Sequence, residues 1–413
     1  MSRGLLAGIR VVESCLLEPG TLGLLLASLG AEVIKVEAPG GGDYIRSTGW
    51  PFIDGTSIMH WHCSRGKSSI ILDLTKDEGV QAYLDLVRQS HVVIEGMRPG
   101  ALERRGLSFD RLREVNPRIV LCSLSGYGGT GPYRDMPSHG LGFDAWAGTA
   151  PPAVDEQGRP HVPDFTPIGA RVGPVYGAVA VLAALLRANA TGEPCQIDIS
   201  QSEAAAAVNW FVIEAYKAYE RPEPEVTGNP ADGGARRPPG VGGMRDGVRY
   251  QYYASKDGHV LFMASERHFW EKFCHAVGRV DLFEKYPGSQ YADHALGNDE
   301  LRSALTEIFS RRTTNDWVSL GIAQNIPIAP VNDGQSLRSD PHFQARVQWL
   351  PAADYGADLL PPPIRLVGED LPVTSKAPSY GGQTGEVLRR VLGYPEERVA
   401  ELRRHGVLGD VPA

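Results

Sequence analysis

The sequence predicts an α/β protein with a doubly wound parallel sheet in a large domain and a second, smaller α+β domain. Short β-branched runs alternate with helical patterns over residues 9–124, and strands connected through helices in this way are parallel. A Pro-, Gly- and Arg-rich stretch at 221–248 interrupts this pattern, and a hairpin with an Asp-Gly turn follows it. A chain of 413 residues also exceeds what one compact core usually holds.

Composition and charge exclude several classes of protein. A hydrophobic share of 42% with 22% charged residues excludes wholesale disorder, and a net charge of -8 argues against a nucleic acid partner. The five cysteines are scattered singly, which favours a reduced, cytoplasmic compartment. The His60–Cys63 run lacks a second cluster that would complete a metal site, so we expect no metal. No signal peptide or membrane span is expected, and the longest apolar stretch, 175–186, predicts a buried helix.

Each element of the large domain follows from its local pattern. The β-branched run at 9–12 precedes a Pro-Gly pair and leucines at helical spacing, and Gly30 then stops the helix before a second strand. The segment 126–173 is loop-rich, and long loops beyond strand ends commonly carry functional residues. The expected strands are 9–12, 31–37, 69–74, 91–95, 119–124 and 196–199, and the expected helices are 22–29, 76–89, 107–115, 177–188 and 202–218.

The second half of the chain predicts a smaller unit and a return to the first. The hairpin strands are expected at 250–254 and 260–264, the helices at 269–276 and 299–310, and extended chain at 328–331 and 350–373. An amphipathic pair of helices, 384–392 and 395–404, closes the chain. The predicted organisation is a large domain over 1–220, a linker over 221–248, a small domain over 249–325, and a returning linker with C-terminal helices packed on the large domain over 326–413.

Six segments in chain order resemble the class III CoA-transferase family, which includes formyl-CoA transferase, carnitine CoA-transferase and α-methylacyl-CoA racemase. The resemblance implies a Rossmann-like large domain built from both chain ends, an inserted small domain, an interlocked homodimer, and coenzyme A (CoA) or acyl-CoA as co-substrate with a carboxylic acid acceptor. The segments are LGAEVIKVEAPGGGDYIR (29–46), RGKSSIILDL (65–74), IEGMRPGALERRGL (94–107), NPRIVLCSLSGYGGTGPY (116–133), AALLRANATGEPCQIDIS (183–200) and IPIAPVNDGQSLRSDPHFQAR (326–346).

Coenzyme A carries a 3'-phosphate and a pyrophosphate, so its site needs basic side chains at strand ends and helix N-termini. The basic candidates are Lys67, Arg98 and Arg104, and the resemblance puts Leu72 and Arg104 on positions that contact CoA. Two positions depart from the family pattern: Ala38 stands where an arginine is frequent, and Gly96 stands where formyl-CoA transferase has asparagine. The resemblance also implies that the glycine-rich loop at 240–243 in the linker forms a lid over the thioester.

The resemblance implies an aspartate nucleophile that forms a mixed anhydride and then an enzyme-bound CoA thioester. Its expected position, counted back from the Thr191-Gly192 turn, falls on Gly169 or Ala170, where no acid is present. Asp164 is the nearest carboxylate, and a loop of different length could deliver it to the same place. Asp164 beside a proline is alternatively a turn or capping residue.

A histidine supports a different chemistry. His139, in SHGLGFDAWAG, matches the register of an acid/base histidine in α-methylacyl-CoA racemases, and a histidine that titrates near neutrality suits proton transfer at an α-carbon. The racemase pattern has an aspartate where Gly140 follows His139. Asp144 is a candidate substitute acid, and Glu18, near a position where transferases carry a site-lining glutamine, is a further carboxylate candidate.

Three functions therefore remain open from the sequence. The first is CoA transfer between a thioester and a carboxylic acid, with Asp164 as the displaced nucleophile. The second is racemisation, isomerisation or dehydration of an acyl-CoA, with His139 as the acid/base group. The third is a catalytically silent CoA-binding subunit that pairs with an active paralogue, or a binding module.

Overall fold

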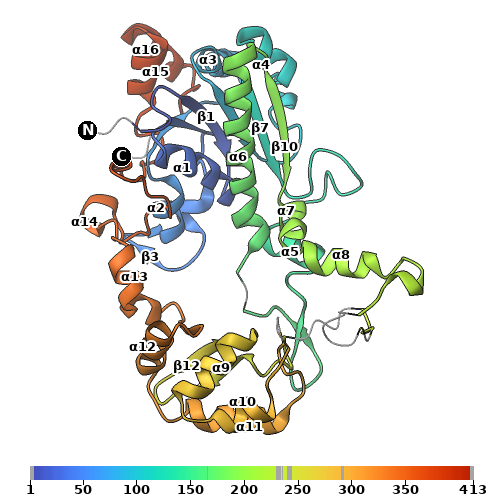
Figure 1. Ribbon diagram of the computed structural model, residues 1–413. Coiled ribbons are helices and arrows are strands. Elements are labelled where there is room, and N and C mark those ends of the chain that lie inside the picture. The colour runs from blue at the N-terminus through green and yellow to red at the C-terminus, as the bar shows by residue number, and fades with distance from the viewer. Residues whose placement is uncertain are drawn as a thin grey trace. The chain divides into compact units, whose positions relative to one another are not determined.

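The computed structural model describes residues 4–164, 166–228, 234, 236–239, 244–289 and 293–409. The chain divides into two compact units, a large one formed by Met1–Trp210 with Val347–Ala413 and a small one formed by Phe211–Arg346 (Figure 1). Both ends of the chain therefore belong to the large unit. The loop 240–243, predicted as a lid, lies outside the described residues.

A six-stranded parallel sheet in the order β10-β7-β6-β1-β2-β5 forms the centre of the large unit, which confirms the α/β fold with a parallel sheet. The β-branched runs form these strands because both faces of a parallel sheet are buried. The strands are β1 (Arg10–Cys15), β2 (Glu32–Glu37), β5 (Lys67–Ile71), β6 (Val92–Gly96), β7 (Val120–Ser125) and β10 (Cys195–Ser200).

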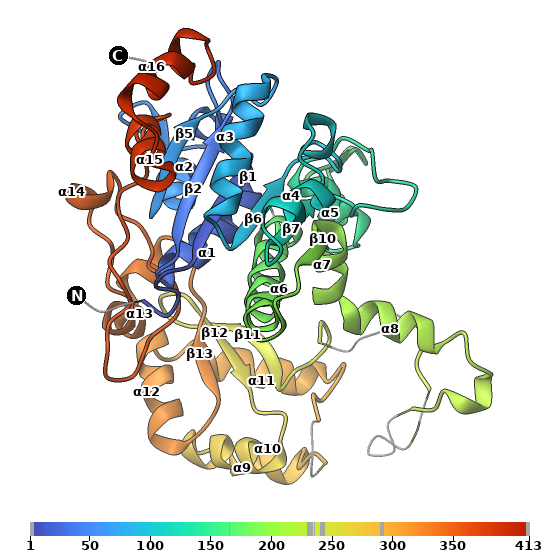
Figure 2. The ribbon, with the colours of Figure 1, turned by 90° about the horizontal axis from the view of Figure 1, so that it is seen from above.

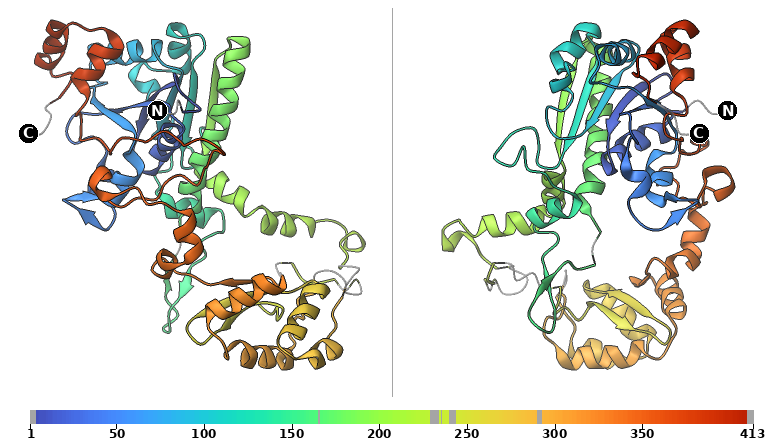
Figure 3. Two further views of the ribbon diagram at one scale, coloured as in Figure 1. Left: turned by 60° about the vertical axis from the view of Figure 1, so that its left-hand side comes forward. Right: turned by 180° about the vertical axis from the view of Figure 1, so that it is seen from behind.

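Helices cover both faces of this sheet (Figure 2). On one face, α3 (Asp77–Arg88) and α4 (Phe109–Val115) pack over the strands, and α15 (Thr384–Leu392) and α16 (Glu396–Arg404) extend the same core. On the other face, α1 (Thr21–Ser28) and α6 (Ile168–Thr191) bury their apolar side chains. The C-terminal helices thus lie beside N-terminal elements, as the two views in Figure 3 show.

The helix α6 is longer than its pattern predicted, since it begins at Ile168 and not at residue 177. Pro174 lies inside it, and Gly169 and Gly173 let it approach the next helix closely. Its length and composition alone would allow it to cross a membrane, but 44% of its most apolar window is buried inside the protein, as in the core helix of a globular protein.

Three further departures from the expected elements surround the site described below. The expected helix 202–218 is two helices, α7 (Gln201–Val208) and α8 (Trp210–Ala218), and between them the Asn209 amide donates a hydrogen bond to the Ala147 carbonyl. Two short helices were not predicted, α2 (Ile58–Ser64) and α5 (Gly140–Trp146). The minor elements of the large unit are β3 (Phe52–Ile53), β4 (Thr56–Ser57), β8 (Ala153–Val154), β9 (Pro160–His161) and α14 (Ala352–Tyr355).

The small unit has its own aromatic-rich core under a three-stranded antiparallel sheet in the order β11-β12-β13. The predicted Asp-Gly hairpin forms β11 and β12, and the segment at 328–331 supplies the third strand. Its elements are β11 (Tyr250–Ala254), β12 (His259–Met263), α9 (Arg267–Ala276), α10 (Val280–Lys285), α11 (Asp299–Phe309), α12 (Thr314–Gln324), β13 (Ile328–Pro330) and α13 (Pro341–Arg346).

Candidate active site

The strand order places a switch point between β1 and β6. From this pair the chain continues through β2 and β5 in one direction and through β7 and β10 in the other. Ligands of open α/β sheets bind at such a point, beyond the carboxyl ends of the strands. The chain leaves β1 here through Leu16 and Leu17, and Glu18–Gly20 then form a 3-10 turn.

A buried network of four charges lies directly behind this segment. The Lys35 ammonium contacts Glu13 at 3.2 Å and Asp43 at 2.9 Å, and the Lys67 ammonium contacts both Glu13 carboxylate oxygens at 2.8 and 2.7 Å. All four side chains are almost completely buried. Lys67 also donates to the Gly20 carbonyl at 2.6 Å, so the network ties β1, β2 and β5 to the turn after β1.

Pairing keeps Lys35 and Asp43 charged despite their burial. Burial alone would raise the pKa of Asp43, but the Lys35 ammonium and the N–H groups of Ile45 and Leu17 outweigh it and hold that pKa below its ordinary value. Burial would likewise lower the pKa of Lys35, but Glu13 and Asp43 raise it above its ordinary value. The contact between Lys35 and Asp43 is therefore an ion pair and not a contact of neutral groups.

The same network stabilises an unusual backbone conformation. Leu17 has φ 60° and ψ -144°, a conformation that residues other than glycine rarely adopt. Its N–H donates to the Asp43 carboxylate, with distances of 3.1 and 3.2 Å to the two oxygens. Gly96, at the end of β6, leaves room for this turn, because a Cβ there would lie 2.6 Å from Cys15 Sγ and from Pro19 Cβ.

Glu18 projects from this turn toward the N-terminus of α6. Its Oε1 accepts a hydrogen bond from Arg171 Nε at 2.8 Å, and its side chain is only 17% exposed while that of Arg171 is 60% exposed. A Cβ built on Gly140 would lie 3.5 Å from the Ala170 Cβ and 3.9 Å from Glu18 Oε2. Glu18 Oε2 and the Ala170 Cβ therefore both lie near Gly140.

Of the two positions expected for the nucleophile, only residue 170 has room for a side chain. A Cβ on Gly169 would lie 2.5 Å from the Gln201 carbonyl oxygen, which is closer than real contacts allow. Ala170 is buried and contributes a methyl group. The structure thus has no carboxylate on the first turn of α6.

Asp144 instead provides a carboxylate to this turn from α5. Its Oδ1 accepts hydrogen bonds from the Ile168 N–H and the Thr149 hydroxyl, both at 2.9 Å, and the Gly169 N–H lies 3.4 Å from either oxygen. A carboxylate is favourable at a helix N-terminus, where the first N–H groups lack partners within the helix. Asp144 is 1% exposed, so it caps α6 and is shielded from solvent.

The two catalytic residues predicted from the sequence both lie at the surface. His139 is exposed and immediately precedes α5, where its carbonyl accepts a hydrogen bond from the Gly142 N–H. Asp164 is exposed in the bend between β9 and α6. Among the described residues, no hydrogen bond or ion pair connects either side chain with Glu18, Asp144 or Arg171.

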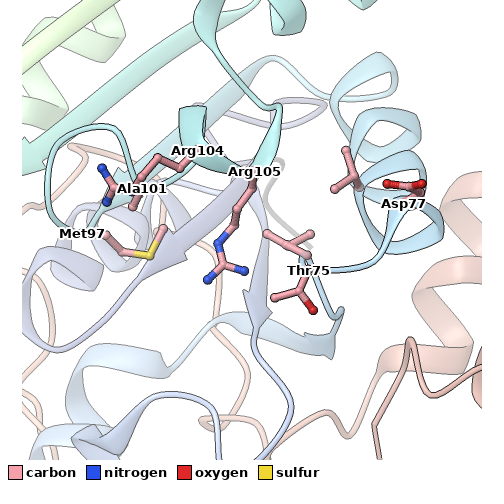
Figure 4. Close-up of a pocket in the computed structure, with 8 residues that line it drawn as sticks. Thr75, Asp77, Met97, Ala101, Arg104 and Arg105 are labelled. Atoms are coloured by element: carbon pink, nitrogen blue, oxygen red, sulfur yellow. The ribbon is translucent and has the colours of Figure 1, made fainter.

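A basic pocket of about 530 Å³ opens at the carboxyl ends of β5 and β6. Arg104 from the sequence prediction lines it, and Arg105 extends into the space between Met97 and Thr75 (Figure 4). Arg98 is exposed on the turn before the pocket, and Leu72 is buried at the end of β5. The labelled lining residues are Thr75, Asp77, Met97, Ala101, Arg104 and Arg105.

Several residues of the site were not singled out from the sequence. Asp43 and Arg105 lie inside segments that resemble the family, and Arg171 is adjacent to the vacant nucleophile position. The sequence signal that could have identified them as site residues was therefore their closeness to these motifs. Lys67 was predicted to bind phosphate, but its ammonium is enclosed by Glu13 and Gly20 and faces away from solvent. The described residues contain no group of three metal-ligating side chains.

The sequence pattern of CoA-transferase family III matches residues 6–384. The chain belongs to this family. It is 29% identical to the succinyl-CoA–L-malate CoA-transferase beta subunit of Chloroflexus aurantiacus, over 98% of each chain. It is 27% identical to human succinyl-CoA:glutarate CoA-transferase, over 98% of this chain and 90% of that protein. The fold resembles a CaiB/BaiF family protein from Brucella suis, with a TM-score of 0.75, 26% identity, and coverage of 94% and 100% of the two chains.

The burial of Lys67 makes a prediction that separates a structural role from a cofactor-binding one. We expect Lys67→Met to lower the free energy of unfolding by about 3 kcal/mol or more, because it removes one of the two ammonium groups that neutralise buried Glu13. Urea unfolding measures this loss. A variant of unchanged stability with weakened CoA binding would instead show that Lys67 binds phosphate.

Proposed function

We propose that this CoA-transferase family III enzyme moves CoA from an acyl-CoA donor to a small carboxylic acid at the switch point between β1 and β6. The observation that carries the proposal is a partly buried carboxylate, Glu18, paired with an exposed arginine, Arg171, at the same sheet edge as a basic pocket. A carboxylate can take up an acyl group, and an arginine can hold the acid that leaves or enters. The malate and glutarate transferases among its relatives support a short dicarboxylic acid as a substrate.

We further propose that CoA binds with its phosphates at the pocket beyond β5 and β6. Arg104 and Arg105 bring two cations to one opening, and Arg98 adds a third on the neighbouring turn. The Leu72 side chain is buried, so its backbone would meet the cofactor. The reaction needs no metal in this proposal. All five cysteines are unpaired, which is compatible with a reduced, cytoplasmic compartment.

The proposed functional form is a homodimer. One face of α6 exposes Val175, Val179 and Leu186, which follow one another at helical spacing, and Val179 is 62% exposed. Contiguous apolar surface of this kind is uncommon on monomeric soluble proteins and typically marks an interface. A second copy of the chain is the proposed partner, as the family resemblance implies.

The transfer reaction is tested by isotope exchange. We expect the purified protein to move CoA from succinyl-CoA to labelled succinate, malate or glutarate, measured as label in the thioester fraction. CoA binding without exchange in any pairing would favour the silent subunit and contradict transfer. Deuterium uptake at the acyl α-carbon that is lost in His139→Ala would favour racemase-type chemistry, and loss of exchange in Asp164→Ala would favour Asp164 as the nucleophile.

The CoA pocket is tested by removing its cations. Arg104→Ala and Arg105→Ala should each weaken CoA binding about 10- to 150-fold, since a hydrogen bond to a charged group contributes about 1.5–3 kcal/mol. Isothermal titration calorimetry with CoA and with phosphate-free pantetheine separates phosphate contacts from other contacts. The control is Arg111→Ala, which removes an exposed arginine paired with Glu114 on α4 and should leave the affinity unchanged. Equal losses for CoA and pantetheine would contradict phosphate binding here.

The homodimer is tested by sedimentation equilibrium. We expect twice the chain mass of 44.7 kDa for the native protein and a shift toward one chain mass for Val179→Lys, which places a charge on the apolar face of α6. Val367→Lys is the control, because Val367 is fully exposed in the segment before α15. A native protein of single chain mass would contradict the proposal.

A further inference from the structure

We infer that Glu18 is the covalent nucleophile of this enzyme, in place of an aspartate on α6. The inference rests on the proposed CoA transfer and assigns its central step to one side chain. Glu18 directly follows the strained Leu17 at the switch point, and its Oε2 lies beside Gly140, which the Ala170 Cβ also approaches. Asp144 is the other carboxylate held near this turn, where it caps the N-terminus of α6.

The contacts and the backbone conformation that position Glu18 reduce the stability of the fold. Four charged side chains are buried behind it. One of them, Asp43, stabilises the rare conformation of Leu17 by accepting a hydrogen bond from the Leu17 N–H. Burial of ion pairs and adoption of such a conformation both consume folding free energy. Strained backbone that is fixed by surrounding contacts occurs frequently at active sites, and here its direct consequence is the direction in which Glu18 leaves the sheet.

Arg171 engages only one of the two Glu18 oxygens in the part of the chain that the structure describes. Arg171 pairs with Oε1, whereas Oε2 lies beside Gly140, which the Ala170 Cβ also approaches. Gly140 contributes no side-chain atoms, and Ala170 contributes only a methyl group. Glu18 therefore brings a carboxylate, from the turn after β1, to the neighbourhood of residue 170, where the first turn of α6 has none.

The other nearby acids are less suited to the role. Both oxygens of Asp144 face the N-terminal N–H groups of α6, and the side chain is buried. Acylation of Asp144 would remove the helix cap and require the site to open. Asp164 is exposed, and no contact in the described residues fixes its direction toward α6.

The chemistry balances at Glu18 without a further reactant. A Glu18 oxygen attacks the thioester carbonyl, the C–S bond breaks, and CoA leaves as a thiolate from an acyl-glutamyl anhydride. The thiolate then attacks the Glu18 carbonyl carbon, releases the donor acid as carboxylate, and leaves a glutamyl-CoA thioester. The acceptor carboxylate repeats these two steps in reverse, which forms the new acyl-CoA and regenerates the Glu18 carboxylate.

Trapping identifies the residue that carries the intermediate. The native enzyme, incubated with succinyl-CoA and then treated with hydroxylamine, should yield a hydroxamate that peptide mass spectrometry maps to Glu18. An acceptor acid labelled with ¹⁸O should also transfer label into the Glu18 side chain. The bridging oxygen of the second anhydride comes from the acceptor carboxylate, and it stays on Glu18 when the CoA thiolate attacks the acceptor acyl carbon. An adduct or label on Asp164, Asp144 or another residue would overturn the inference while CoA transfer stands.

Substitution gives an independent test. Glu18→Gln should lower the rate of exchange by at least about 10³-fold, because the amide cannot act as the nucleophile. Glu32→Gln is the matched control, since Glu32 is also partly buried and paired with arginines. Glu32 lies at the amino end of β2, away from the carboxyl ends of the strands where the site is. Circular dichroism and CoA titration establish that each variant is folded and binds its cofactor.

A second substitution tests the equivalence of the two positions. Ala170→Asp in the Glu18→Gln background should restore exchange, because residue 170, like Glu18 Oε2, lies beside Gly140. Retained exchange in folded Glu18→Gln would overturn the inference and leave the proposed function intact. A native enzyme that exchanges CoA with no acid would overturn the proposed function and this inference with it.

Discussion

The buried pairing of Glu13 with Lys35 and Lys67 is the constraint on which the site depends. Removal of ammonium and carboxylate groups from water is favourable only when each finds close partners, and the network supplies them across three adjacent strands. Asp43 joins the network from the chain beyond β2 and stabilises Leu17. The sheet and the turn after β1 are therefore fixed by one set of interactions, and a change in the sheet would shift the candidate nucleophile.

Local patterns were sufficient to predict most of the fold. The β-branched runs and leucine periodicities correspond to the six strands of the parallel sheet and to its covering helices, because burial on one or both faces requires those patterns. The unpredicted α2 and α5 have only seven residues each, which is too short for a helical periodicity to stand out. The break between α7 and α8 lies at Asn209, whose amide donates a hydrogen bond to the Ala147 carbonyl. Helical periodicity does not encode this contact.

The site was less accessible from the sequence because charge does not reveal burial. Arg104, which the family resemblance predicts to contact CoA, lines the basic pocket. Lys67, with the same formal charge and a similar place near a strand, is enclosed by Glu13. The carboxylates differ in the same way: Glu18 and Asp144 acquire distinct environments only when β1, α5 and α6 come together. Spacing along the chain identified the vacancy at Gly169 or Ala170 but not the Glu18 side chain that lies near it in the structure.

The arginine beside the proposed nucleophile determines when in the reaction the acceptor acid binds most strongly. While Glu18 is a carboxylate, Arg171 pairs with its Oε1, and the two charges compensate each other. Acylation or thioester formation neutralises Glu18, so the Arg171 guanidinium loses that partner and attracts another carboxylate. The acceptor acid thus binds most strongly when the enzyme carries the intermediate that it must attack. Regeneration of the Glu18 carboxylate restores the ion pair and weakens the hold of Arg171 on an acid in the site.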